Sequence, residues 1–162
     1  MILRKTIQTT TCALLALVLG EAVFARFTPR VQVLPKISID SQLNMPPEIT
    51  LFVQKSCGDC HTSESHFPWY GKVPPVSWML ERDVREAHSA VDFTNWSSRN
   101  GRTPVRSVAT LMLACSDLES GRMPLAKYLW LHPDAKPTSD QVKDFCGWAN
   151  QESARLSGRA AK

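Results

Sequence analysis

The chain has 162 residues, of which 43% are hydrophobic and 21% are charged, and its net charge at pH 7 is +4. This composition is that of a globular protein, so it excludes a disordered chain, and the length suits one domain with one hydrophobic core. The small positive charge does not indicate a basic surface for nucleic acid. We therefore expect no nucleic-acid partner.

Residues 1–25 have the pattern of an export signal. Arg4 and Lys5 form a basic start, an uncharged run of about 15 residues extends to Glu21, and a small-residue cleavage site ends at Ala25. The run is shorter than the roughly 20 residues that span a bilayer, which favours cleavage and a periplasmic or otherwise exported protein. A retained N-terminal anchor is the alternative, and only then do we expect membrane contact. Cleavage removes two of 19 basic and one of 15 acidic residues and leaves a net charge of +3.

The next segment, 26–45, contains Pro29 and Pro35 and few periodic apolar positions, which predicts an extended lead-in. Pro46 and Pro47 suit the first turn of a helix. The apolar positions that follow have the three- and four-residue spacing of a buried helical face: Ile49, Phe52, Val53 and Cys57. This predicted helix leads directly into the most specific motif of the chain.

That motif is Cys57-Gly58-Asp59-Cys60-His61, and Cys-x-x-Cys-His is the pattern of c-type haem attachment. On a helix, Cys57 and Cys60 share a face, where their thiols can add to the two vinyl groups of one porphyrin. His61 can then bind the iron as the proximal ligand. A thioredoxin-like redox pair, a zinc half-site and a chance match are the alternatives. The motif predicts one haem c, and therefore one iron, per chain.

Further helices are expected after the motif. Apolar periodicity and the Pro and Gly positions place them at about 75–91, 105–120, 125–131 and 139–154, with a long polar connection over 92–104 and a polar tail at 155–162. In the helix at 75–91, the stripe expected to face inward is Val76, Met79, Leu80, Val84, Ala87 and Val91. We find no alternating strand pattern. The expected fold is a small all-α, cytochrome c-like bundle of four or five helices around one covalently bound haem, in a domain spanning 46–154.

Two more cysteines, Cys115 and Cys146, fall on the inward sides of the predicted third and last long helices. In an oxidising compartment they can form a disulfide that joins these helices. Two separate buried thiols are the alternative. We favour the disulfide.

Several motifs in order resemble the bacterial haem-binding domain family, which is related to the cytochromes c. They are the stretch Cys57–Glu64, then Phe67-Pro68-Trp69-Tyr70, Pro74–Trp78, Asp83-Val84, Asp92–Trp96, Gly121–Leu125, Tyr128 and His132–Lys136. The likeness covers roughly residues 46–153. It implies an exported, single-haem helical domain, found alone or beside other cytochrome modules. His66 departs from the family, which often has Arg there.

The sixth ligand of the iron decides between electron transfer and reaction with small molecules. Met123 lies just past Gly121, and Pro124 biases it away from helical geometry, as expected for a side chain projecting from a loop. Its Met-Pro pair also resembles the distal-ligand loop of class I cytochromes c. His132, His66 or no sixth ligand are the alternatives. Trp69 and Trp78 are candidate porphyrin contacts, with plain core packing as the other interpretation.

We expect an electron carrier rather than a catalyst, with an unidentified redox partner protein. A five-coordinate haem enzyme with peroxidase-like activity is one alternative function. A haem-based gas or redox sensor module is another.

Overall fold

The computed structural model describes residues 38–64, 67 and 69–159. This part of the chain forms six α-helices and two 3-10 helices: α2 (Pro47–Ser56), α3 (Gly58–His61), η1 (Trp69–Lys72), α4 (Val76–Ala90), α5 (Pro104–Glu119), α6 (Ala126–Leu129), η2 (Pro133–Ala135) and α7 (Ser139–Arg159). No strand occurs in it, and the prediction of an all-α domain is confirmed. The predicted export signal at 1–25, residues 26–37 of the lead-in, His66 and residues 160–162 lie outside the described residues.

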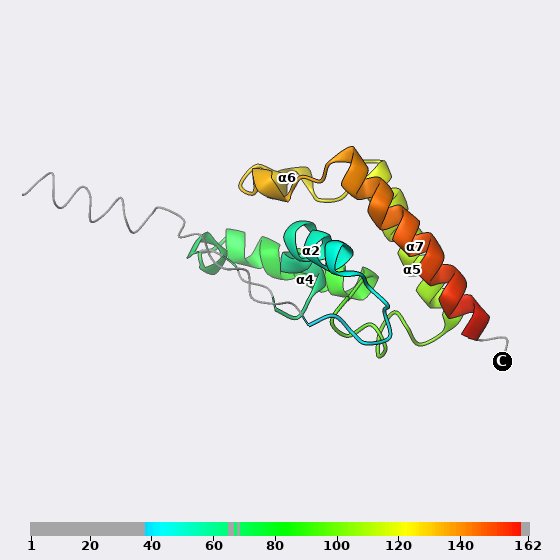
Figure 1. Ribbon diagram of the computed structural model, residues 1–162. Coiled ribbons are helices and arrows are strands. Elements are labelled where there is room, and N and C mark those ends of the chain that lie inside the picture. Colours follow the sequence, from blue (N-terminus) through cyan, green and yellow to red (C-terminus); the bar gives the residue numbers. More distant parts are fainter. Residues whose placement is uncertain (1–37, 65–66, 68, 160–162) are drawn as a thin grey trace, which may run out of the picture. The chain divides into compact units, whose positions relative to one another are not determined.

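The two longest helices, α5 and α7, lie side by side and make the most extensive contact between elements (Figure 1). Cys115 on α5 and Cys146 on α7 form the predicted disulfide, with 5.2 Å between their Cα atoms. One turn further along α5, Leu118 lines the same pocket as Val142, which precedes Cys146 on α7. The two helices are therefore antiparallel, and their pairing forms the scaffold of the domain.

The helix that leads into the Cys-x-x-Cys-His motif, α2, packs against this scaffold. It begins after Pro46, and Pro47 at its first position has no backbone N–H that would need an acceptor. Its buried apolar side chains are Ile49, Phe52 and Val53. The rings of Phe52 and Phe145 on α7 lie 5.5 Å apart. This contact fixes the end of α2 at which the motif starts.

The last helix is longer than its sequence pattern predicts, because α7 ends at Arg159 and not near Ala154. Leu156 is buried and continues the inward stripe of the helix. Arg155 pairs with Glu152 and donates from Nη2 to the carbonyl oxygen of Gln42 at 2.6 Å. Residues 155–159 are thus helix and not tail.

The end of the predicted lead-in is docked on α7. Leu43 is buried in the core. The backbone N–H of Asn44 donates to Oε1 of Glu152 at 2.9 Å, and Nε1 of Trp148 donates to the carbonyl oxygen of Asn44 at 2.9 Å. Because both backbone groups of Asn44 are bound, the chain enters α2 in a fixed direction.

The stripe predicted to face inward on α4 is only partly covered. Ala87 is buried, but Met79 is 52% exposed and Val76 is 38% exposed. The reason is that α4 packs mainly on two short elements, α3 and η1. The expectation that the whole stripe is buried is therefore wrong for its first turn.

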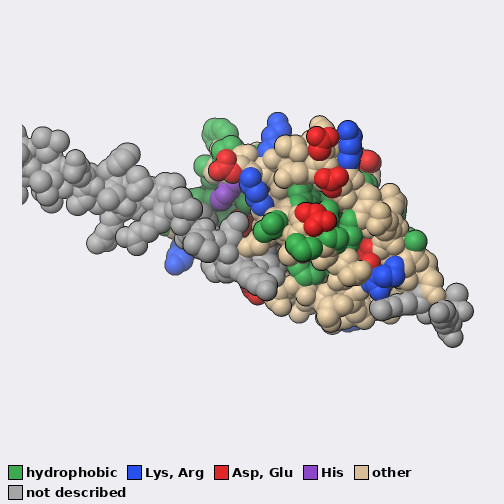
Figure 2. Space-filling model, in the orientation of Figure 1, with side chains coloured by type: hydrophobic (Ala, Val, Ile, Leu, Met, Phe, Trp, Pro, Cys, Tyr) green, Lys and Arg blue, Asp and Glu red, His purple; other side chains and the backbone are tan. Residues whose placement is uncertain are grey.

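Charges of both signs are mixed on the face drawn in Figure 2, with hydrophobic side chains exposed between them. The large exposed hydrophobic residues include Trp69, Val73, Trp78, Met79, Trp130 and Leu131. Among the helices of the described residues, none has the length and apolar character to cross a membrane.

Candidate functional site

The Cys-x-x-Cys-His motif forms one tight turn. α2 stops at Ser56, and Cys57 leaves the helical conformation with φ of −125°. The backbone N–H groups of Cys60 and His61 then donate to the carbonyl oxygen of Cys57, at 3.2 and 2.9 Å, and close the short helix α3. The turn brings both cysteines and the histidine together at the end of a packed helix.

Both motif cysteines are free and partly buried. Burial raises the pKa of Cys57 to about 12, with a smaller contribution from Cys60. Burial also raises the pKa of Cys60 to about 11, and the negative charge of Asp59 adds to the effect. Both thiols are therefore neutral at physiological pH, which suppresses oxidation because the thiolate is the reactive form.

The imidazole of His61 is held in a defined tautomer. Its Nδ1–H donates to the carbonyl oxygen of Val91 at 2.9 Å. Burial lowers its pKa below the ordinary value, so the ring is neutral. A neutral imidazole with Nδ1 bound to a carbonyl is the usual state of a metal-ligating histidine, with Nε2 as the ligand atom.

The backbone of the motif is also anchored on its C-terminal side. The N–H of Phe93 donates to the carbonyl oxygen of His61 at 2.9 Å. Thr62 is fully buried, and its hydroxyl donates to the carbonyl oxygen of Gly58 at 2.7 Å. His88 on α4 donates from Nε2 to the carbonyl oxygen of Thr62 at 3.0 Å. These contacts fix the backbone on both sides of His61, from which its side chain extends.

Asp92 and Asn100 organise the connection between α4 and α5. Both are buried, with 0% and 1% of the residue exposed. Asp92 accepts from the N–H groups of Thr94 and Asn95 at 3.1 and 2.9 Å, and Arg99 Nε lies 3.2 Å from its carboxylate. The predicted long polar connection is thus an ordered loop that lies against the Cys-x-x-Cys-His motif.

A second group of contacts joins the segment 127–132 to the motif side of the domain. Tyr128 donates from Oη to Oδ2 of Asp59 at 2.8 Å, and its ring stacks on that of His132 with centroids 4.3 Å apart. Tyr70 Oη lies 2.5 Å from Nε2 of His132. Lys127 pairs with Asp83 of α4 at 2.6 Å. We call these three contacts, Tyr128–Asp59, Tyr70–His132 and Lys127–Asp83, the segment clamp.

The environment of Tyr128 keeps its phenol protonated. Burial raises the pKa of Tyr128 well above its ordinary value, and the negative charge of Asp59 raises it further. Because the phenol stays neutral, it remains a donor to the Asp59 carboxylate over the physiological pH range. Deprotonation of the phenol therefore does not break the contact between segment and motif near neutral pH.

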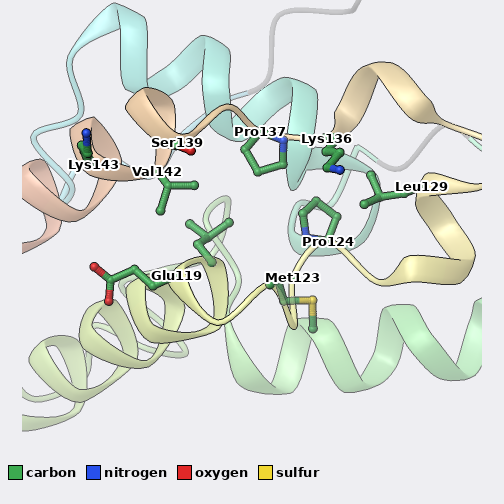
Figure 3. Close-up of a pocket in the computed structure, with 11 residues that line it drawn as sticks. Glu119, Met123, Pro124, Leu129, Lys136, Pro137, Ser139, Val142 and Lys143 are labelled. Carbon is green, nitrogen blue, oxygen red and sulfur yellow. The ribbon is translucent and has the colours of Figure 1, made fainter.

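Met123 lies on the loop that follows α5. Gly121 begins this loop with a positive φ of 68°, a conformation that glycine adopts without strain, and the N–H of Met123 donates to the carbonyl oxygen of Asp117 at 3.1 Å. Met123 is half-buried at an open pocket of about 450 Å³ that Glu119, Pro124 and Val142 also line (Figure 3). None of Cys57, Cys60 and His61 lines that pocket.

The remaining predicted site residues occupy different environments. Trp69 on η1 and Trp78 on α4 are each 65% exposed, whereas Trp96 and Trp148 are buried in the core. His132 is half-buried between two tyrosines. The structure thus brings Cys57, Cys60 and His61 into one turn and leaves both candidate tryptophans at the surface.

Sequence reasoning missed the partners of the motif. Tyr128 binds the motif directly through Asp59. Tyr70 acts through His132, and Asp92 and Asn100 act through the loop whose residue Val91 binds His61. Asp92 carried a local signal, because an Asp that accepts from N–H groups two and three residues later is a common turn former. The tyrosines stood out only through the family resemblance, and their partners could not be predicted, because Tyr128 and Asp59 are 69 residues apart and only the fold joins them.

A small helical domain with a Cys-x-x-Cys-His turn and a neutral, oriented histidine defines a haem-binding class of protein. The family model described as a haem-binding domain matches residues 18–151. The chain belongs to this family and is a haem-binding domain. The match begins well before Pro46, in a segment where the motifs show no likeness. No curated protein and no solved structure matches the chain.

Proposed function

We propose that this domain is an exported, monohaem c-type cytochrome that transfers single electrons. Cys57 and Cys60 hold the porphyrin covalently, His61 is the proximal ligand, and Met123 is the distal ligand. The geometry of His61 carries the proposal. Its Nδ1–H is bound by Val91, so Nε2 is the ligand atom, one residue after the second of two free thiols.

The chemistry of these donors fits haem c. Two thiols in one turn can each add to a vinyl group and form a thioether. A thioredoxin-like pair, in contrast, uses a thiol with a lowered pKa, whereas the pKa values of Cys57 and Cys60 are both raised. When bound, haem c supplies an iron that takes up and releases one electron. The chain supplies the ligands, the burial and the orientation that tune this exchange.

The exposed aromatic residues support the same proposal. Trp69, Trp78 and Met79 present apolar surface on η1 and α4, and α4 packs on both α3 and η1. Aromatic and thioether side chains pack well on a flat porphyrin, and an indole N–H can donate to a propionate. In this proposal Trp69 and Trp78 are therefore cofactor contacts.

Two observations support Met123 as the distal ligand. One is the position of its loop, and the other is that the alternative ligand, His132, is already held by other contacts. Met123 leaves the end of α5 in a loop whose next element, α6, is tied to Asp59 by Tyr128. The ring of His132, in contrast, is already stacked on Tyr128 and bound to Tyr70. This arrangement favours Met123, because using His132 would break both contacts.

Optical spectra of the haem-loaded protein, with and without carbon monoxide, test the ligand assignment. The proposal predicts a six-coordinate iron with a sulfur-to-iron band at the red end of the spectrum, and loss of that band with rapid carbon monoxide binding in Met123→Ala. Met112→Leu is the matched control, because Met112 packs against the core and its replacement keeps the apolar volume. A spectrum unchanged by Met123→Ala removes the assignment. An open iron in the unaltered protein favours the peroxidase-like enzyme or the sensor module.

Export is proposed from residues 1–25 and agrees with the Cys115–Cys146 disulfide, since such bonds persist in oxidising compartments. A redox partner protein there would receive or supply the electron. Mass spectrometry of protein from an exporting bacterial host tests this: a chain beginning at Arg26 in the periplasmic fraction supports cleavage. An intact N-terminus in the membrane fraction supports the anchor instead.

A further inference from the structure

We infer that Asn100 is a positioning residue for the proposed iron ligand His61. Its side-chain amide binds one backbone group on each side of Val91, a pair of contacts that we call the bracket, and thereby sets the hydrogen bond between Val91 and His61. This rests on the proposed role of His61 and adds a residue that neither the motif nor the family match identifies. Two hydrogen bonds join Asn100 to the backbone on either side of Val91, and two more join His61 to the backbone of Val91 and Phe93.

The bracket has two arms. Nδ2 of Asn100 donates to the carbonyl oxygen of Ala90 at 2.7 Å, and Oδ1 accepts from the N–H of Asp92 at 2.9 Å. These two backbone groups flank Val91 on either side. One side chain must therefore donate and accept at once, and an amide of this length does both. Because Asn100 is 1% exposed, water does not replace either arm when it is lost.

The bracketed residue is the one that His61 uses. Val91 caps α4 with an extended backbone, φ −141° and ψ 126°, and its own N–H donates to the carbonyl oxygen of Ala87. Its carbonyl oxygen accepts from Nδ1 of His61 at 2.9 Å, and two residues later Phe93 donates to the carbonyl oxygen of His61. The segment 91–93 thus binds His61 on one side and Asn100 on the other.

The loop returns Asn100 to this position by a second set of contacts. The buried carboxylate of Asp92 binds Thr94, Asn95 and Arg99, and the nine residues from Asp92 to Asn100 form a closed turn. Asp92 supports the bracket, whereas Asn100 is the only one of the described side chains that binds both groups flanking Val91.

The consequence for His61 follows from the chemistry of ligating histidines. A carbonyl that accepts from Nδ1–H fixes the ring and increases the electron donation of Nε2, which favours the ferric state of an iron bound there. If Val91 loses its bracket, this hydrogen bond becomes longer and less directional. The ratio of ferrous to ferric iron at a fixed potential should then rise.

The test compares Asn100→Leu, of similar volume but without polar atoms, with Trp148→Phe. The control removes a hydrogen bond to the Asn44 carbonyl elsewhere in the domain and so loosens the fold without touching the bracket. In the haem-loaded proteins, we expect the ferrous-to-ferric ratio at fixed potential to rise about tenfold in Asn100→Leu and to stay constant in Trp148→Phe. Asn100→Ser, too short to reach both backbone groups, provides the same comparison should Asn100→Leu not fold.

A second readout does not require haem. Nitrogen NMR of the haem-free chain should show the Nδ1–H tautomer of His61, with its N–H exchanging about tenfold faster in the Asn100 variants than in the unaltered chain or in Trp148→Phe. Unchanged exchange and an unchanged ratio overturn the inference, as does an equal change in Trp148→Phe. If the unaltered chain never binds haem, the proposed function fails, and this NMR comparison still decides whether Asn100 positions His61.

Discussion

Tyr128 provides a sharp test of how the segment after Met123 is held. Tyr128→Phe deletes one oxygen atom and with it the 2.8 Å hydrogen bond to Asp59. The phenylalanine ring can keep the stacking on His132, whose centroid lies 4.3 Å away. The substitution therefore removes one arm of the segment clamp and leaves the packing in place.

The expected magnitude follows from the charge and exposure of the acceptor. Hydrogen bonds to charged groups contribute about 1.5–3 kcal/mol, and the half-buried position of Asp59 places this bond at the lower end. We expect the free energy of unfolding to fall by about 1.5 kcal/mol. The same loss makes the opened form of residues 123–132 about tenfold more populated, if they open as one unit.

Urea unfolding measures the first effect, and stopped-flow carbon monoxide binding to the ferrous haem-loaded protein measures the second. If Met123 is the distal ligand, as proposed, it has to leave the iron before the gas enters, and the binding rate should rise about tenfold. Arg82→Met is the control outside the clamp, since it removes only an exposed ion pair with Glu86 on α4, and such pairs contribute little to stability. A loss of stability without any change in the gas-binding rate would refute the idea that the clamp holds Met123.

Three other predictions concern the thiols, the disulfide and a helix cap. In the haem-free chain at pH 8, the raised pKa of about 11 for Cys60 leaves about 0.1% thiolate, against about a quarter for an ordinary thiol, so alkylation measured by mass spectrometry should be about 200-fold slower than in the same chain unfolded in guanidinium. Folding favours the neutral thiol, so its contribution to stability is complete below about pH 8.5 and is lost as the pH rises through 11. Equal alkylation rates in the folded and the unfolded chain would contradict the raised pKa of Cys60. Replacing Cys115 and Cys146, 31 residues apart, by serine should lower the free energy of unfolding by roughly 4 kcal/mol in the chain-entropy account, and a loss below about 1 kcal/mol would contradict it. Thr103→Ala removes the acceptor for the N–H of Arg106 at the start of α5 and should lower the free energy of unfolding by about 1 kcal/mol, with Thr103→Ser as the control that keeps the cap.

The helices were predictable where the sequence carries local signals. Pro46-Pro47 and Thr103-Pro104 mark the starts of α2 and α5, and Gly121 with positive φ marks the end of α5. The inward positions of Cys115 and Cys146 predicted their pairing. These features depend on propensity and periodicity within single helices, so they can be recognised from the sequence.

What could not be predicted depends on distant partners. The last turn of α7 is stabilised through Arg155, which binds Gln42, 113 residues away. The first turn of α4 has an apolar stripe, but Met79 stays 52% exposed because α4 packs mainly on the short elements α3 and η1. Asn100 has no pattern of its own, because its role appears only when Ala90 and Asp92 are placed beside it. Within the candidate site, the motif was therefore predictable, and its supports were not.

Covalent attachment of haem through Cys57 and Cys60 is the central claim, and acid-acetone extraction followed by mass spectrometry tests it most directly. The protein should be matured in an exporting host that makes c-type cytochromes. The account predicts that the colour stays with the polypeptide and that its mass exceeds that of the chain by one haem. The colour should be lost in the double variant Cys57→Ala, Cys60→Ala and kept in Cys115→Ser, Cys146→Ser. Extraction of all the colour from the unaltered protein, or a mass without added haem, would contradict the account.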